Sequence, residues 1–215
     1  MGDKIVAHVT RRGPSGNVEY DQDMSETAWS GTGATGSIPF DAEGNYTVYL
    51  VAYDKAGNKS QSEPVTFVID KTAPVLSISG MNDMQNTDVN ATFTMNEAFG
   101  VVNGKSPEAT VTITKKVDGS AATTVATLNY GSFTSGNPHT AGYRFTEDGD
   151  YSITFSGKDA SGNVANTVTR NFKIDKVAPE LTIKATKNDT TEPVANYGSV
   201  GNVQNLSLIH ISEPT

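Results

Sequence analysis

Apolar and polar residues alternate along several short segments of this chain. Between residues 151 and 156, Tyr151, Ile153 and Phe155 alternate with serine and threonine, and residues 46–52 alternate in the same way. A period of two is typical of a strand with one buried face and one face exposed to solvent. The pattern therefore predicts antiparallel β-sheets and an all-β fold.

Further alternating segments predict about seven short strands between residues 72 and 176. In chain order, the expected strands are marked by Leu76 and Ile78; Ala91, Phe93 and Met95; Val111, Ile113 and Lys115; residues 125–130; Tyr143 and Phe145; Tyr151, Ile153 and Phe155; and Phe172 and Ile174. Asp118-Gly119, between the third and fourth strands, is a strong hairpin signal. Short strands at this spacing are typical of a β-sandwich.

The chain repeats itself with an offset of 105 residues and no gap, so that residues 43–78 reappear at 148–183. The most specific matches are EGNY with DGDY at 43 and 148, DKAGN with DASGN at 54 and 159, and FVIDKTAP with FKIDKVAP at 67 and 172. A repeat of this length predicts modules in tandem. The Asp-x-x-Gly-Asn element is predicted to be a turn in which Gly57 and Gly162 adopt positive φ.

The repeat divides the chain into four expected parts. These are the C-terminal strands of one module at 1–71, a complete module at 72–176, the start of a third module at 177–205, and a tail at 206–215. The first part is expected to be truncated because Ala7 and Val9 fit the third strand of a module. The third part holds one opening strand, with Leu181 and Ile183, and is expected to be poorly ordered. The tail resembles translated sequencing-adapter DNA and is excluded from fold and function.

These motifs resemble the bacterial immunoglobulin-like domains that occur in tandem on surface proteins. Asp-Gly-x-Tyr resembles the "tyrosine corner" before the penultimate strand, which implies a structural role for Tyr46 and Tyr151. Asp-Lys-Thr-Ala-Pro resembles the junction between two modules. Pro74 and Pro179 would stiffen these junctions, because proline fixes its own φ and restricts the residue before it. The resemblance implies tandem immunoglobulin-like sandwiches, with the first and last modules truncated.

Composition excludes several classes of function. Lys and Arg number 16 against 24 Asp and Glu, a net charge of −8 with no basic block, so nucleic acid is not an expected partner. No stretch approaches the ~20 apolar residues of a membrane-spanning helix, so no membrane insertion is expected in this chain. The absence of cysteine excludes disulfides and thiolate sites.

No catalytic constellation is visible in the sequence. Outside the tail only His8 and His139 are present, and neither lies in a recognisable motif. Trp29 could stack on a sugar but is more simply part of a core. We therefore expect no catalytic residues and no enzymatic activity.

Calcium is the one cofactor that the sequence suggests, since it takes oxygen ligands from Asp, Asn and backbone carbonyls. The candidate ligands are Asp54, Asn58, Asp159 and Asn163 in the two repeated turns and Asp70 and Asp175 at the two junctions. The alternative is that the turn residues only cap their own turns and the junction aspartates pair with lysine.

Two functions fit these expectations. The first is a structural spacer in an extracellular, cell-surface or cell-wall protein, whose partners are the neighbouring modules of the same chain. The second is an adhesive or carbohydrate-binding accessory module, with a host or polysaccharide ligand. An aromatic cluster exposed on a sheet face or end loop would favour the second function.

Overall fold

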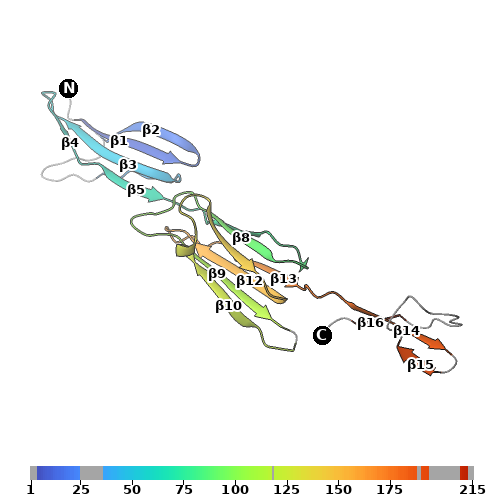
Figure 1. The fold of residues 1–215 in the computed structure, drawn as a ribbon. Coiled ribbons are helices and arrows are strands. Elements are labelled where there is room, and N and C mark those ends of the chain that lie inside the picture. The colour runs from blue at the N-terminus through green and yellow to red at the C-terminus, as the bar shows by residue number, and fades with distance from the viewer. Residues whose placement is uncertain (1–3, 25–35, 118, 188–189, 194–208, 213–215) are drawn as a thin grey trace.

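The computed structural model describes residues 4–24, 36–117, 119–187, 190–193 and 209–212, with side-chain environments up to residue 180. This part of the chain consists of strands and one short 3-10 helix, η1 (Tyr130–Ser132). Three sheet-forming regions follow one another along an elongated molecule (Figure 1). The predicted all-β fold is confirmed. No helix in the described ranges is long and apolar enough to cross a membrane.

The first region is one antiparallel sheet. Its strands are β1 (Lys4–Gly13), β2 (Gly16–Asp23), β3 (Gly44–Tyr53), β4 (Lys59–Gln61) and β5 (Val65–Ile69). Their order is β2-β1-β3-β4, and β5 also pairs with β3. Ala7 and Val9 lie opposite Leu50 and Val48 in the register, and both are buried, as the alternation predicts.

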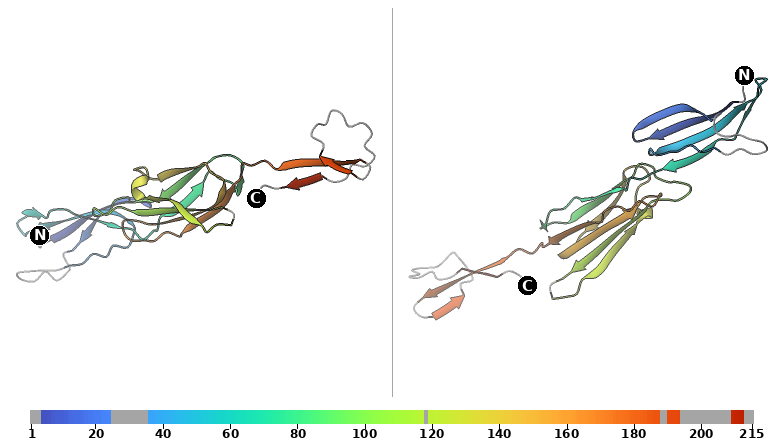
Figure 2. Two further views of the ribbon diagram at one scale, coloured as in Figure 1. Left: turned by 60° about the horizontal axis from the view of Figure 1, so that its bottom comes forward. Right: turned by 180° about the vertical axis from the view of Figure 1, so that it is seen from behind.

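The second region contains two sheets. One has the order β10-β9-β12-β13-β7, from Thr123–Asn129, Glu108–Lys116, Gly149–Lys158, Val168–Ile174 and Met84–Gln85. The other has the order β11-β8-β6, from His139–Phe145, Val89–Asn96 and Val75–Ser79. All pairings are antiparallel except that of β7 with β13. Figure 2 shows the two sheets from two further directions.

A single apolar core fills the space between these two sheets. Its fully buried members are the inward residues of the alternating segments: Phe93 and Met95 in β8, Val111 and Ile113 in β9, Phe145 in β11, Ile153 and Phe155 in β12, and Ile174 in β13. Edge-to-face packing of Phe145 on Tyr151 and Phe172, with ring centroids 4.9 Å apart in each pair, stabilises one end of the core. The predicted strands are therefore present.

Three details differ from the predicted strands. The strand expected at 125–130 is Thr123–Asn129, with a register shift between Thr124 and Ala126, and Tyr130 begins η1. Lys115 does not continue the apolar face of β9, because its ammonium pairs with Glu147 at 2.6 Å and lies 5.9 Å from the Tyr151 ring centroid. The two-residue strand β7 was not predicted, and Asp118 of the expected hairpin lies outside the described residues.

The two halves of the repeat pair their strands in the same way. Arg11 lies opposite Tyr46 in the first sheet as Lys115 lies opposite Tyr151 in the second region. The third region pairs β14 (Glu180–Lys187) with β15 (Thr190–Pro193) and with β16 (Ile209–Ser212). Thus β14 has backbone partners, and one of them, β16, lies within the ten C-terminal residues that were expected to be no part of the fold.

Candidate metal centre

The turn after β12 is built around the carboxylate of Asp159. Its Oδ1 accepts hydrogen bonds from the backbone N–H groups of Gly162 and Asn163, at 2.6 and 2.8 Å. Its Oδ2 accepts one from Nδ2 of Asn163 at 2.7 Å. Gly162 adopts a φ of 102°, which a residue with a Cβ rarely tolerates. These bonds hold the Asp159 side chain, which is only 2% exposed, in one orientation.

The repeat produces the same turn after β3. There, Oδ1 of Asp54 accepts from the backbone N–H of Asn58 at 2.9 Å, and Oδ2 accepts from its Nδ2 at 2.7 Å. Gly57 adopts a φ of 91°. Both Asp54 and Asn58 are exposed. The turn is therefore a local structure that forms in an exposed setting.

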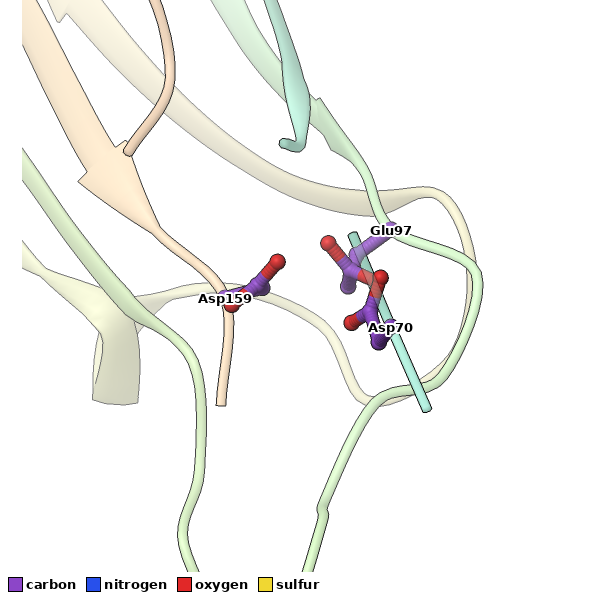
Figure 3. A group of neighbouring side chains, drawn as sticks. All are labelled: Asp70, Glu97 and Asp159. Carbon is purple, nitrogen blue, oxygen red and sulfur yellow. The ribbon is translucent and has the colours of Figure 1, made fainter. Parts of the chain in front are cut away.

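Asp159 lies next to two further carboxylates, those of Asp70 and Glu97. One ligand oxygen from each of the three residues lies within 4.8 Å of the others. The three carboxyl groups converge on one space (Figure 3). Asp70 immediately follows β5, and Glu97 immediately follows β8. The cluster thus joins the end of the first sheet to one end of the paired sheets.

Two oxygen atoms in this cluster are buried without a hydrogen-bond donor in the described part of the chain. They are Oδ2 of Asp70 and Oε2 of Glu97. The other oxygens have partners: Oδ1 of Asp70 accepts from Thr72 N–H at 3.2 Å, and Oε1 of Glu97 accepts from Phe99 N–H at 3.1 Å. Glu97 is only 3% exposed. Buried anionic oxygens without a partner are costly, and a cation would relieve this cost.

The electrostatics of the cluster also favour a bound cation. Burial raises the pKa of Asp70 and repulsion from Asp159 adds to the rise, while hydrogen bonds from Thr72 and Ser161 oppose it. Burial likewise raises the pKa of Glu97, and the charges of Asp70 and Asp159 add to the effect. Like charges brought together out of water disfavour one another, whereas a cation at their centre would favour the charged forms.

The donor set suits a hard divalent cation. Calcium takes six to eight oxygen ligands from carboxylates, amide and backbone carbonyls and water at roughly 2.3–2.6 Å. The cluster supplies three carboxylates from three separate segments of the chain. Two of their oxygens are free of other bonds. The residues present therefore fit such an ion, and water would complete its coordination.

One side chain connects the cluster across the junction. Nδ2 of Asn163 donates to Oδ2 of Asp159 and also, at 3.1 Å, to the backbone carbonyl of Asp70. A direct protein contact therefore links the turn after β12 to the segment after β5.

Only some of the six candidate ligands predicted from the sequence lie close together in the structure. It brings Asp70, Asp159 and Asn163 together. Among the described residues, Asp70, Asp159 and Glu97 form the only group of three acidic, histidine or cysteine side chains close enough to share an ion. Asp175 repeats part of the Asp70 arrangement, since its Oδ1 accepts from Val177 N–H at 3.1 Å, and it pairs with Lys173 at 3.7 Å.

Sequence reasoning missed Glu97, which lies outside the repeated segments. A signal was nevertheless present. Residues 91, 93, 95 and 97 continue the inward phase of β8, so a glutamate stands at a position where the alternation predicts a buried apolar side chain. A carboxylate at a predicted core position needs a partner.

Equivalent hydrogen bonds recur at the start of β3 and β12 and in the junction segments after β5 and β13. Tyr46 donates its hydroxyl to Ala42 O at 2.7 Å, and Tyr151 donates to Glu147 O at 2.9 Å, the geometry of a tyrosine corner. The backbone N–H of Lys71 donates to Glu43 Oε1 at 2.6 Å, and that of Lys176 donates to Asp148 Oδ2 at 3.2 Å. Of the two junction prolines, Pro74 is buried and Pro179 is exposed.

The two histidines outside the C-terminal tail, His8 and His139, each make local contacts. His8 pairs with Asp21 at 2.5 Å and stacks on Tyr49. The buried His139 lies between the hydroxyl of Tyr130, at 3.3 Å, and the carbonyl of Thr134, at 3.0 Å. Trp29 lies outside the described residues.

Comparisons with solved structures give weak overall similarity. The crystal structure of a tetra-tandem repeat in the extending region of a large adhesion protein aligns with a TM-score of 0.39 and 18% identity. The alignment covers 86% of this chain and 45% of that one. The FN1–FN3 domains of chicken CNTN1 align with a TM-score of 0.28 and 12% identity, over 80% of this chain and 57% of that one. This chain thus spans about half the length of either structure. No curated protein matches the sequence.

A comparison with family models covers the first sheet. The matched residues, 3–71, run from the start of β1 to the junction segment after β5, and include Tyr46, the Asp54 turn and Asp70. This confirms the resemblance inferred from the repeat: over residues 3–71, the chain matches the bacterial Ig-like domain family.

Proposed function

We propose that this chain is a non-catalytic structural segment of an extracellular, surface-attached protein, and that a divalent cation, calcium, links two of its Ig-like modules. The observation that carries the proposal is the pair of buried, unpartnered oxygens, Asp70 Oδ2 and Glu97 Oε2, in a cluster whose third carboxylate is that of Asp159. Each module supplies part of the site. The ion would therefore bind most tightly when the modules are docked.

The physical role of the cation would be to fix the orientation of adjacent modules. Without an ion, three carboxylates repel one another at the point where the chain passes from β5 to β6. With an ion bound, the same groups attract the junction segment to the turn after β12. A spacer needs this property, because its length and direction depend on how each module sits on the next.

The repeat supports a structural role over a catalytic one. The tyrosine hydrogen bonds, the Asp-x-x-Gly-Asn turns and the lysine N–H bonds recur in both halves of the repeat. Residues that recur in this way serve the architecture of each module. They also provide the elements that place Asp70 and Asp159 in one cluster.

The test is the calcium dependence of thermal unfolding of the full chain. A ligand that binds only the folded state stabilises it by about 2.7 kcal/mol when its free concentration is 100 times the dissociation constant. We expect the unfolding midpoint to rise in calcium relative to excess chelator. An unchanged midpoint, together with no heat of calcium binding by calorimetry, would refute the cation site.

A matched pair of variants localises the site. Asp159→Asn removes a charge from the cluster, and Asp54→Asn makes the same change in the equivalent exposed turn. We expect D159N to abolish most of the calcium-dependent shift and D54N to retain it. Equal loss in both variants would place calcium binding elsewhere.

A further inference from the structure

Glu97 is held at two points, which leaves only one of its oxygens free. Its backbone N–H donates to Oδ1 of Asn137 at 3.0 Å, and its Oε1 accepts from Phe99 N–H at 3.1 Å. The remaining oxygen, Oε2, is buried without a partner in the described part of the chain. The first of these bonds comes from a residue 40 positions away, so it fixes Glu97 relative to a different element of the fold.

The strand register explains why Asn137 reaches this position. His139 of β11 lies opposite Met95 of β8, so the chain just before β11 runs beside the chain just after β8. β8 ends at Asn96 and β11 begins at His139, so Glu97 and Asn137 lie just outside the paired strands. Beyond that point the side chain of Asn137 supplies the acceptor for the buried Glu97 N–H.

We propose that Asn137 is a positioning residue for the cation site: its amide oxygen fixes the backbone of Glu97 so that Oε2 faces Asp70 and Asp159. This inference rests on the proposed cation site. Groups that hold metal ligands in place commonly matter to affinity, and their loss weakens metal binding by roughly 10- to 100-fold. Asparagine suits the task, because it accepts the hydrogen bond without adding a fourth negative charge.

The segment that carries Asn137 has other anchors, which provide a control. Oγ1 of Thr134 accepts from Thr140 N–H at 2.9 Å, and the backbone N–H of Thr134 donates to Thr140 O at 2.8 Å. Thr134→Val removes the side-chain acceptor from this segment and leaves the bond between Asn137 and Glu97 intact. It therefore measures the effect of a weakened segment alone.

The experiment is calorimetric titration of the full chain with calcium, well below the unfolding midpoint of every variant. We expect Asn137→Ala to weaken calcium binding by about 10- to 100-fold. Thr134→Val should lower the unfolding midpoint without changing the affinity. Asn137→Asp keeps the acceptor and adds a charge that attracts the cation, so it should bind at least as tightly as the unmodified chain.

Three results would overturn the inference. N137A could bind calcium as tightly as the unmodified chain, or T134V could lose as much affinity as N137A. If the unmodified chain binds no calcium, the proposed cation site fails as well, and this outcome is distinct because it precedes any comparison of variants. Should N137A fail to fold by circular dichroism, Asn137→Leu fills a similar volume without an acceptor and is judged by the same criteria.

Discussion

Asn163 donates a hydrogen bond from its side-chain amide to the backbone carbonyl of Asp70, 3.1 Å away and 93 residues earlier in the chain. The same nitrogen donates to Oδ2 of Asp159 at 2.7 Å. One amide group thus stabilises the turn after β12 and ties that turn to the segment after β5. In the equivalent exposed turn, Asn58 makes the corresponding bond to Asp54.

This relationship predicts different effects for two equivalent substitutions. Asn58→Ala removes a turn bond on the surface, and Asn163→Ala removes a turn bond and the contact with Asp70. Hydrogen bonds to charged groups contribute about 1.5–3 kcal/mol when shielded from water and less when exposed. We expect N163A to lower the unfolding midpoint more than N58A, and to broaden the small-angle scattering distance distribution of the full chain.

The scattering result distinguishes a junction contact from a turn contact. Loss of a turn bond alone should leave the relative orientation of the modules unchanged. If N58A broadens the distance distribution as much as N163A does, then the bond between Asn163 and Asp70 has no particular role in fixing the junction.

Glu97→Gln should have opposite effects with and without calcium. Burial and two neighbouring carboxylates raise the pKa of Glu97, and each unit of such a rise corresponds to about 1.4 kcal/mol against the charged form. Without divalent cations, the neutral glutamine should therefore stabilise the protein near neutral pH. With calcium, the unmodified chain should gain more stability than E97Q.

Thermal unfolding in chelator and in calcium measures both effects. Glu108→Gln is a suitable control, because Glu108 pairs with Lys158 on an exposed part of β9. The explanation fails if E97Q is less stable than the unmodified chain in chelator.

Much of the fold could be predicted because its core strands bury only one face. Phe93, Met95, Ile153 and Phe155 are fully buried at positions that the alternation assigns to the inward face. The register shift in β10 and the two-residue strand β7 leave no such periodic signal. They depend on how neighbouring strands meet, which is a tertiary property.

The candidate site could be predicted only in part, for a similar reason. Asp159 and Asn163 lie in one local turn, so their spacing in the sequence is enough to place them together. Glu97 reaches that turn from the end of β8, which requires the second region to fold. Asp70 reaches it from the end of β5, which also requires the first sheet to lie against the second region. The repeat identified Asp70 as a junction residue but not its neighbours. Glu97 could be found from the sequence only by noticing that a charged residue continues the buried, inward phase of a strand.

Tyr151→Phe should reveal the contribution of the tyrosine hydroxyl alone. The hydroxyl donates to Glu147 O at 2.9 Å, and the ring packs on Phe145 and Phe172. Phenylalanine keeps the ring contacts and removes the hydrogen bond, so we expect a loss of about 1 kcal/mol in the free energy of unfolding. Tyr151→Ala should cost about 3–5 kcal/mol, as for other large aromatic residues in a core.

Urea denaturation of the full chain measures both losses in the transition of the second module. Tyr46→Phe makes the same change in the first sheet, where the hydroxyl bonds to Ala42 O at 2.7 Å. If Y151F and Y151A were equally destabilised, the hydroxyl rather than the ring would account for the role of Tyr151.

We expect Asp88 to contribute stability that is lost in acid. Hydrogen bonds from Lys176 and then Arg144 hold the pKa of Asp88 below its ordinary value of about 3.9. Because the folded-state pKa is lower than the unfolded one, the folded state binds fewer protons between the two values. The contribution is therefore fully present above about pH 4 and disappears as the pH falls through the folded-state pKa. Unfolding midpoints of the unmodified chain and Asp88→Asn should differ at pH 7 and converge toward pH 2. Lys176→Met removes the principal partner and should reproduce part of the same loss at pH 7. A difference between D88N and the unmodified chain that persisted undiminished at pH 2 would mean that Asp88 acts through packing and not through its charge.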